Sequence, residues 1–186
     1  IGQGSSAAVH LATFKKEDNQ SEITCAAKVF ELGFRDQKMF YNEIECQASL
    51  RHEAILPLIG FSVSAYGFKP AILLPYMKNG SLRNMIEQYQ RRLCPLKWDE
   101  TAKAINIFGI AAGMAYIHQH DIVRGDLKPD NILLDEFYHP KICDFGIVKR
   151  VKYGESFTNN EFVGTPIYVA PEVLLDSEIL TNKIDV

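Results

Sequence analysis

Three polar side chains with different chemistry lie close together between two apolar runs. The stretch IVRGDLKPDNILLDE (122–136) contains Asp126, Lys128 and Asn131. A carboxylate can accept a proton, an ammonium can contact a phosphate, and an amide oxygen can bind a metal ion. Because so many polar groups are costly to order in one loop, we predict that these three residues serve a function.

A second carboxylate follows this loop. Asp144, in KICDFGIVK (141–149), comes after a short apolar run and lies next to a flexible glycine segment. Carboxylate and amide oxygens are ligands that Mg²⁺ prefers, and magnesium commonly takes few protein ligands together with substrate phosphates. Asn131 and Asp144 are therefore candidate magnesium ligands.

A glycine-rich turn near the start of the chain could bring backbone amides close to phosphate oxygens. The residues GQGSSAAV (2–9) form a G-x-G-x-x-A pattern, with Gly2, Gly4 and Ala7 at the small positions. The pattern alone is weak evidence, and a plain hairpin turn explains it equally well. A dinucleotide-binding motif would need a helix after the turn, whereas a strand-like run follows here.

Two segments after this turn could position a charged pair. ITCAAKVF (23–30) alternates with period two, which predicts a strand with Lys28 and Ala26 on one face. From Phe34 to Leu50 the period is helical, and one face carries Met39, Glu43, Cys46 and Leu50. A carboxylate in such an apolar stripe is costly unless a cation or strong donors meet it, so Glu43 needs a partner.

Strands and then helices are predicted for the following segments. AILPLIGFSV (54–63) and PAILLPYM (70–77) are strand-like apolar runs. Ser81 is the predicted N-cap of a helix with an apolar face made of Leu82, Met85, Ile86 and Tyr89. A longer helix is predicted from about Trp98 to His118, with an apolar face made of Ala102, Ile105, Phe108, Ala112 and Ala115. This order predicts an α+β fold with two lobes.

The composition is that of a globular protein with a real core. The 186 residues are 47% hydrophobic and 23% charged, and the formal net charge is -3, which argues against a nucleic-acid partner held by phosphate contacts. The four cysteines form no C-x-x-C pair, and no apolar segment is long enough to span a membrane. We therefore expect a cytoplasmic chain without a membrane span in this segment.

Six motifs in order resemble those of a eukaryotic protein kinase domain, and together they cover nearly the whole chain. GQGSSAAV resembles the glycine-rich loop, AAK at 26–28 the strand-3 lysine motif, and Glu43 the glutamate of helix C. RGDLKPDN resembles the catalytic loop, and DFG (144–146) and APE (170–172) complete the series. Lys128 and GTPIYVAPE are similar to serine/threonine kinases, and PYMKNGSL to tyrosine-kinase hinges, which indicates the tyrosine-kinase-like group.

The resemblance implies an enzyme that uses ATP and Mg²⁺ to phosphorylate a serine or threonine of a protein substrate in signalling. Its catalytic residues would be Lys28, Glu43, Asp126 and Lys128. Asn131 and Asp144 would bind magnesium. The nucleotide would contact Gly2, Gly4, Val9, Ala26, Lys28, Leu74, Met77 and Leu133, with Leu74 at the gatekeeper position and Met77 in the hinge.

The resemblance also implies the division of the chain. Residues 1–75 would form a strand-rich N-lobe with helix C, residues 76–79 a hinge, and residues 80–186 part of a helical C-lobe. Asp185 resembles the aspartate that opens helix F and anchors the catalytic loop. Because the sequence stops at Val186, we expect a truncated kinase domain that is unstable and inactive by itself.

Two departures from the family pattern support an alternative function. The family's His-Arg-Asp reads Arg124-Gly125-Asp126 here, so an activation-loop phosphate at Ser156 or Thr158 would lack its usual arginine. Arg124 also replaces a histidine that normally packs in the family's regulatory spine, and Gln47 stands where that spine usually has an apolar residue, so both changes weaken the expected apolar column beside Phe145. The alternative is a pseudokinase that acts as a scaffold or nucleotide-sensing switch, while a small-molecule phosphotransferase is disfavoured by the GTPIYVAPE segment.

Overall fold

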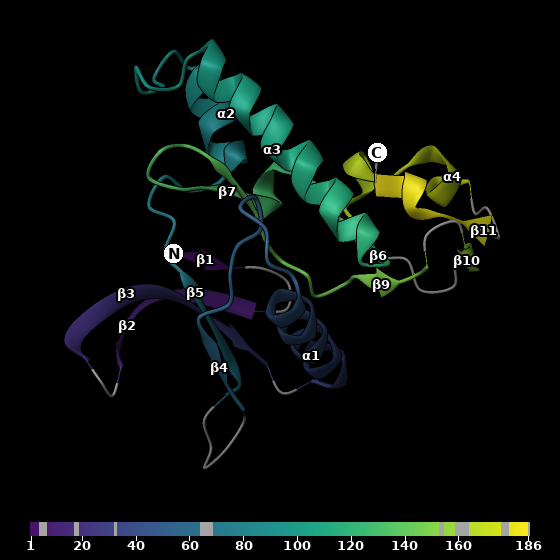
Figure 1. Cartoon of the computed structure of the whole chain (residues 1–186), viewed down its shortest axis with the longest axis horizontal. Helices are drawn as coiled ribbons and strands as arrows, with labels where there is room; N and C mark the ends of the chain where they lie inside the picture. The colour runs from purple at the N-terminus through teal and green to yellow at the C-terminus, as the bar shows by residue number, and fades with distance from the viewer. Residues whose placement is uncertain are drawn as a thin grey trace.

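The computed structural model shows a five-stranded sheet with one helix beside it in one part of the molecule and the remaining helices in the other part (Figure 1). The residues that it describes are 1–3, 7–16, 19–31, 33–63, 69–152, 155–158, 164–175 and 179–185. The predicted α+β class, with strands first and helices later, is confirmed.

The sheet is antiparallel, with the strand order β1-β2-β3-β5-β4. Its strands are β1 (Gly2–Gln3), β2 (Ala7–Lys16), β3 (Asn19–Phe30), β4 (Gly60–Ser62) and β5 (Ala71–Pro75). The central strand β3 contains the predicted strand 23–30. Lys28 is paired with Val9 on β2 and with Ile72 on β5, so the middle of the sheet fixes its position.

Helix α1 (Phe34–Ser49) packs beside the sheet and confirms the helix predicted from residue 34. Glu43, Cys46 and Leu50 are buried, as the predicted stripe requires, and Met39 is partly buried. Phe40 of α1 makes an edge-to-face contact with Phe30 of β3, and both rings are buried. This core fixes Glu43 relative to the sheet.

The segment 54–63 differs from its prediction as one continuous strand, because only β4 is a strand there. Ile55 and Leu56 instead contact the later strand β8 (Pro140–Ile142): Ile55 forms a bridge with Ile142, and the Leu56 amide donates to the Ile142 carbonyl. Pro57 lacks an amide hydrogen and cannot donate to a sheet ladder. The segment therefore connects the first sheet to the second part of the chain.

Helix α2 (Leu82–Gln90) begins as predicted at Ser81, whose hydroxyl accepts from the Asn84 amide at 3.3 Å. Its apolar face is only partly as predicted. Met85 is buried against Trp98 and Leu134, whereas Ile86 and Tyr89 are exposed.

Helix α3 (Glu100–Gln119) lies close to its predicted position, but the predicted apolar face is wrong. Ile105 and Phe108 are exposed, and Asn106, Gly113, Met114 and Ile117 are buried instead. The reason is close packing on β8: a Cβ added to Gly113 would lie 2.7 Å from Ile142 Cδ1. The small residues of α3 therefore decide which face turns inward.

The remaining elements are short and surround the predicted functional loop. They are β6 (Ile122–Val123), η1 (Pro129–Asn131), β7 (Ile132–Leu134), β9 (Lys149–Arg150), β10 (Phe157–Thr158), η2 (Pro166–Tyr168), α4 (Pro171–Leu174), β11 (Ile179–Leu180) and η3 (Asn182–Asp185). β6 pairs with β9, β7 with β8, and β10 with β11. Within the described ranges, no helix has both the length and the apolar character required to span a membrane.

Candidate active site

A lysine and two carboxylates from three elements meet at the centre of the molecule. Lys28 Nζ on β3 lies 2.6 Å from Glu43 Oε2 on α1 and 2.7 Å from Asp144 Oδ1, which follows β8. Glu43 is fully buried, and the Lys28 side chain is 13% exposed. The buried glutamate therefore has the cation that its position in an apolar stripe requires.

The electrostatics of this cluster keep the lysine charged. Burial by itself would lower the pKa of Lys28, but the carboxylates of Glu43 and Asp144 raise it above its usual range. Burial raises the pKa of Glu43, and Lys28 opposes that rise. Burial also acts to raise the pKa of Asp144, yet the nearby Lys28 ammonium outweighs it, so the net shift is downward.

A second cluster lies in the loop between β6 and β7. Lys128 Nζ lies 2.7 Å from Asp126 Oδ2 and donates to Thr165 Oγ1 at 2.6 Å. The Thr165 hydroxyl donates to Asp126 Oδ1 at 2.7 Å, and the Asn131 amide donates to Asp126 Oδ2 at 2.9 Å. Asp126 is therefore held from three directions by short hydrogen bonds.

These contacts keep the Asp126 carboxylate ionised. Burial acts to raise its pKa, but hydrogen bonds from Lys128 and Thr165 outweigh that effect and lower the pKa below its usual range. An ionised carboxylate with an ammonium beside it can accept a proton and, at the same time, lie close to an anionic group.

Asn131 and Asp144 are on neighbouring segments. The Asn131 carbonyl accepts a hydrogen bond from the Cys143 amide at 3.0 Å, directly before Asp144 in the chain. The Asp144 side chain is 40% exposed, so its carboxylate is accessible as well as bonded to Lys28. One carboxylate and one amide oxygen form a donor set that fits Mg²⁺, which takes its other ligands from water and phosphates.

The predicted nucleotide residues lie near this cluster. Leu74 is buried in one apolar group, and Met77 and Leu133 pack against that group from different segments. Ala26 is paired with Leu74 across β3 and β5. Together they form an apolar wall beside Lys28.

The glycine turn is only partly described. Gly2 on β1 is paired with Val9 on β2, and Val9 is itself paired with Lys28, so Val9 lies on the strand next to the lysine and Gly2 on the strand beyond it. Gly4 lies outside the described residues.

Sequence reasoning assigned no catalytic or binding role to Arg124 and Thr165, which the structure places at this site, whereas Asp185 was expected from the resemblance to anchor the catalytic loop. The Arg124 guanidinium donates to the carbonyls of Cys143 and Asp144. The Asp185 carboxylate accepts from the backbone amides of Arg124 and Gly125, each at 2.7 Å. Thr165 contacts Asp126, although the prediction used it only to indicate substrate class. These contacts join residues that are far apart in sequence, which local patterns do not reveal.

A hollow among the described residues lies apart from this site. It is lined by most of residues 47–61, from the end of α1 to β4, by residues of α3 that include Ile105 and Phe108, and by residues 139–141. None of the predicted site residues lines it. The candidate site is therefore defined by its hydrogen bonds and ion pairs.

Comparison with known proteins gives consistent matches. A family model described as protein kinase domain matches residues 1–186. The G-type lectin S-receptor-like serine/threonine-protein kinase RLK1 of Arabidopsis thaliana is 35% identical over 170 residues, which are 89% of this chain and 19% of that protein. The LRR receptor-like serine/threonine-protein kinase SIK1 of Oryza sativa subsp. japonica is 33% identical over 190 aligned residues, with 100% of this chain and 18% of that protein covered.

The LRR receptor-like serine/threonine-protein kinase ERECTA of Arabidopsis thaliana gives a similar result. It is 31% identical over 190 aligned residues, with 100% of this chain and 18% of that protein covered. The chain thus spans less than a fifth of the length of these three relatives.

Proposed function

The chain belongs to the protein kinase family, with the bilobal α+β fold of that family, and from this premise we propose that it transfers the γ-phosphoryl group of ATP to a serine or threonine hydroxyl of a protein. The observation that carries the proposal is the convergence of Lys28, Glu43 and Asp144. Three residues from separate parts of the chain form a partly buried charged cluster that a fold without this chemistry does not require.

Lys28 has the position to contact the phosphates of the nucleotide. Its ion pair with Glu43 fixes the direction of the ammonium, and the raised pKa keeps it protonated at neutral pH. The apolar wall of Ala26, Leu74, Met77 and Leu133 suits the base, and backbone amides near Gly2 suit the phosphates. This supports an N-lobe of residues 1–75, a hinge of residues 76–79 and a C-lobe that starts at residue 80.

Asn131 and Asp144 would hold Mg²⁺, which neutralises charge on the phosphates when it is bound. The hydrogen bond between the Asn131 carbonyl and the Cys143 amide keeps the two segments in register. The Lys28 ion pair orients the Asp144 carboxylate. These contacts would preorganise the two ligands before magnesium arrives.

Asp126 would accept the proton of the substrate hydroxyl as its oxygen attacks the γ-phosphorus and the bond to the β-phosphate oxygen of ADP breaks. Lys128, 2.7 Å from Asp126, would neutralise charge on the transferred group. The Thr165 hydroxyl and amide hold one Asp126 oxygen in place. Most of the catalytic effect would come from such positioning and electrostatics.

The pseudokinase alternative is less well supported. A pseudokinase needs no ordered set of charged groups, whereas Lys28, Glu43, Asp126, Asn131 and Asp144 are linked by short contacts here. We place the activity in signalling, as the names of the relatives suggest, and in the cytoplasm, where ATP is available. Four free cysteines fit a reducing compartment.

The test is magnesium-dependent phosphorylation of a generic serine/threonine substrate by the full-length protein. The Asp126→Asn variant should lose at least about 100-fold in kcat, because an amide cannot accept the proton. Nucleotide binding should remain, since Asp126 does not contact the apolar wall.

Asp130→Asn is the matched control, because Asp130 is an exposed carboxylate in the same loop and should leave the rate unchanged. Nucleotide binding without phosphoryl transfer by the wild type would favour the pseudokinase. Full transfer by Asp126→Asn would contradict the role of Asp126.

A further inference from the structure

The basic loop, residues 91–97, lies between α2 and α3 at the end of the molecule away from the sheet (Figure 1). Its sequence, RRLCPLK, contains three cations and no acid, although the whole chain has a net charge of -3. Two of its residues are exposed leucines, because Leu93 is 69% exposed and Leu96 is fully exposed. The loop therefore presents apolar side chains and positive charge together on the surface.

The end of α2 fixes the first part of the basic loop. The Leu93 amide donates to the Gln88 carbonyl at 2.8 Å, and the Arg92 amide donates to the Tyr89 carbonyl at 3.0 Å, which is the pattern of a Schellman motif. The position of Arg92 in that motif is usually a glycine, because its φ angle is positive, and here the angle is +58°. An arginine at this position is strained, and ending the helix does not require it.

Leu93 departs from the same motif in a second way. The residue at its position commonly packs against an apolar side chain in the last turn of the helix. The corresponding residues of α2 are Glu87 and Gln88, which are polar, and Leu93 stays exposed. A lone exposed leucine is ordinary on a protein surface. Two of them beside a strained arginine in one short loop call for an explanation.

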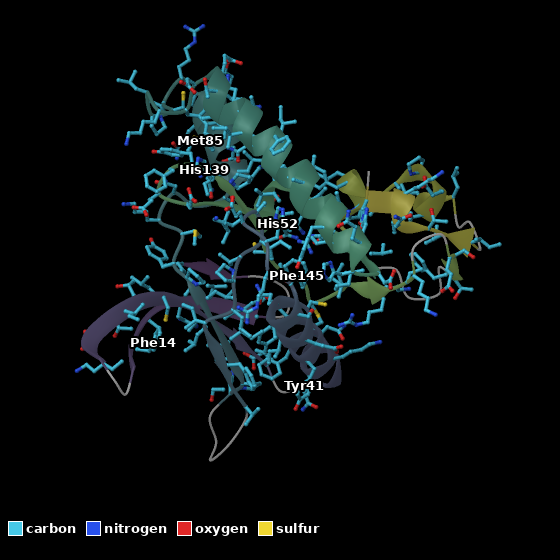
Figure 2. The ribbon with its side chains drawn as sticks, viewed as in Figure 1. Phe14, Tyr41, His52, Met85, His139 and Phe145 are labelled. Carbon is cyan, nitrogen blue, oxygen red and sulfur yellow. The ribbon has the colours of Figure 1, made fainter. Side chains whose placement is uncertain are left out.

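The inner side of the basic loop packs on the core. Trp98, which follows the loop, is buried in an apolar group with Met85, and Cys94 of the loop packs against that group. Met85 lies at the end of the molecule that carries the loop (Figure 2). The loop is therefore held from the inside, while its two leucines stay at the surface.

The acids next to the basic loop already have partners. Glu87 pairs with Arg83 at 2.9 Å, and Glu100 pairs with Lys103 at 2.6 Å. The Asp99 carboxylate accepts from a backbone amide in the first turn of α3. Within the described ranges, no carboxylate forms an ion pair with any of the three cations of the loop. These cations are thus available to anions of a partner.

We propose that the basic loop docks on a lipid surface that carries anionic headgroups. Arg91, Arg92 and Lys97 contact the headgroups, and Leu93 and Leu96 enter the layer between them. Binding of this kind adds the burial of apolar side chains to the attraction between cations and anionic lipids. The charge of the loop is complementary to such a surface, whereas the net charge of the whole chain is not.

The shape of the basic loop favours a lipid surface over a peptide. Peptides are commonly bound at a sheet edge or in a groove. The basic loop is a projecting turn, and none of its residues lines the hollow near α1 and β4. A flat, deformable surface can meet such a turn without a groove.

The first test is co-flotation of the full-length protein with lipid vesicles. The protein should float with vesicles of phosphatidylcholine and phosphatidylserine but not with vesicles of phosphatidylcholine alone. Binding should weaken as salt is added, because exposed charges are screened. Hydrogen–deuterium exchange should slow in peptides that cover the basic loop when the anionic vesicles are present. Failure to bind these vesicles at low salt, or unchanged exchange in the loop, would overturn the proposal.

Two double variants separate charge from insertion. Arg91→Gln/Lys97→Gln should weaken binding to the anionic vesicles by roughly 20-fold, near fivefold for each cation. Leu93→Ser/Leu96→Ser should weaken it by at least about tenfold, because less apolar surface is then buried in the lipid. All four side chains are exposed, so both variants should keep the wild-type melting temperature. Loss of binding in the glutamine variant alone would indicate an acidic protein partner and would overturn docking on lipid.

Arg92→Gly uses the strain at this position. Glycine suits the positive φ angle, so the melting temperature should rise, while binding to the anionic vesicles should weaken by about fivefold. A merely structural role for Arg92 would not produce this opposition. A variant that gains stability and keeps its affinity for the vesicles would overturn the role of Arg92.

Two variants in the sheet region serve as matched controls. Leu11→Ser removes a leucine of β2 that is 54% exposed, and Lys69→Gln removes an exposed cation that pairs with Glu31. Neither should change vesicle binding, and losses equal to those of the loop variants would overturn the proposal. Phosphorylation of a soluble substrate should stay unchanged in every loop variant. That measurement tests the proposed reaction separately, so the failure of one proposal leaves the other decidable.

Discussion

The two charged clusters of the candidate site are built in opposite ways. Lys28, Glu43 and Asp144 come from β3, α1 and the segment after β8, and Lys28 and Asp144 are 116 residues apart in the sequence. Asp126, Lys128 and Asn131 come from one loop, in which Asn131 contacts Asp126, and Thr165 contacts both Asp126 and Lys128. The first cluster depends on the packing of the whole molecule, whereas the second is mostly local.

Glu43 is the most deeply buried charged group of the two clusters, although the side chain of Asp144 in the same cluster is 40% exposed. Glu43 is fully buried, while the side chains of Asp126 and Lys128 are 11% and 20% exposed. Glu43 without its partner stays in a low-dielectric core, whereas a charge in the second cluster can gain water. The first cluster should therefore control stability as well as nucleotide contact, and the second should mainly control chemistry.

The largest expected effect comes from breaking the buried pair. Lys28→Met should lower the free energy of unfolding by about 3–5 kcal/mol, because it leaves the Glu43 carboxylate buried and unpaired. Urea denaturation followed by circular dichroism measures this loss. The double variant Lys28→Met/Glu43→Leu should recover most of it, because no charge is then left in the core.

Lys69→Met is the control for that measurement. Lys69 pairs with Glu31 at 2.7 Å, close to the Lys28–Glu43 distance, but both side chains are exposed. Its loss should change the free energy of unfolding by less than about 1 kcal/mol. Equal costs for the two variants would show that burial does not distinguish the clusters.

A smaller effect is expected from the backbone of the loop cluster. Gly125 has a φ angle of +76°, so Gly125→Ala should lower the free energy of unfolding by about 1–2 kcal/mol. Gly60→Ala is the control, because Gly60 has an ordinary φ angle and open space around its Cα. Thermal unfolding compares the two variants, and a Gly125→Ala cost no larger than that of Gly60→Ala would contradict the strain argument.

The smallest expected effect is the response of Asp126 to acid. Because its pKa is lowered in the folded state, the unfolded chain binds more protons, and stability increases with pH in this range. The contribution should be complete above the unfolded pKa of about 3.9 and disappear as pH falls through the folded pKa. We expect this contribution to the free energy of unfolding to be less than about 1 kcal/mol, since the carboxylate is partly solvated.

The difference in the free energy of unfolding between wild type and Asp126→Asn measures this contribution of the ionised carboxylate. It is determined by urea denaturation from pH 6 down to pH 3. The stability advantage of the ionised carboxylate should shrink toward the acid end. A difference that stays constant across that range would show that the hydrogen bonds from Lys128 and Thr165 do not stabilise the ionised form.

Local patterns in the sequence predicted the elements whose position depends on local chemistry. The period-two run around Lys28, the stripe that contains Glu43 and the Ser81 cap all gave correct elements. The predicted buried face of α3 was wrong. Gly109 and Gly113 allow α3 to approach Pro140 and Ile142 closely, and the spacing of apolar residues does not reveal this approach. The family resemblance indicated which residues to examine, but the contacts of Arg124 depend on the path of the chain in space.

The contacts of Asp185 have a consequence for synthesis of the protein. Its carboxylate binds the amides of Arg124 and Gly125, which leave the ribosome about 60 residues earlier. At a translation rate of about 5–20 residues per second, the Asp185 carboxylate is synthesised roughly 3–12 seconds after the loop that it binds. During that interval the nascent loop lacks its anchor, so a chaperone that shields it would act before residue 185 emerges.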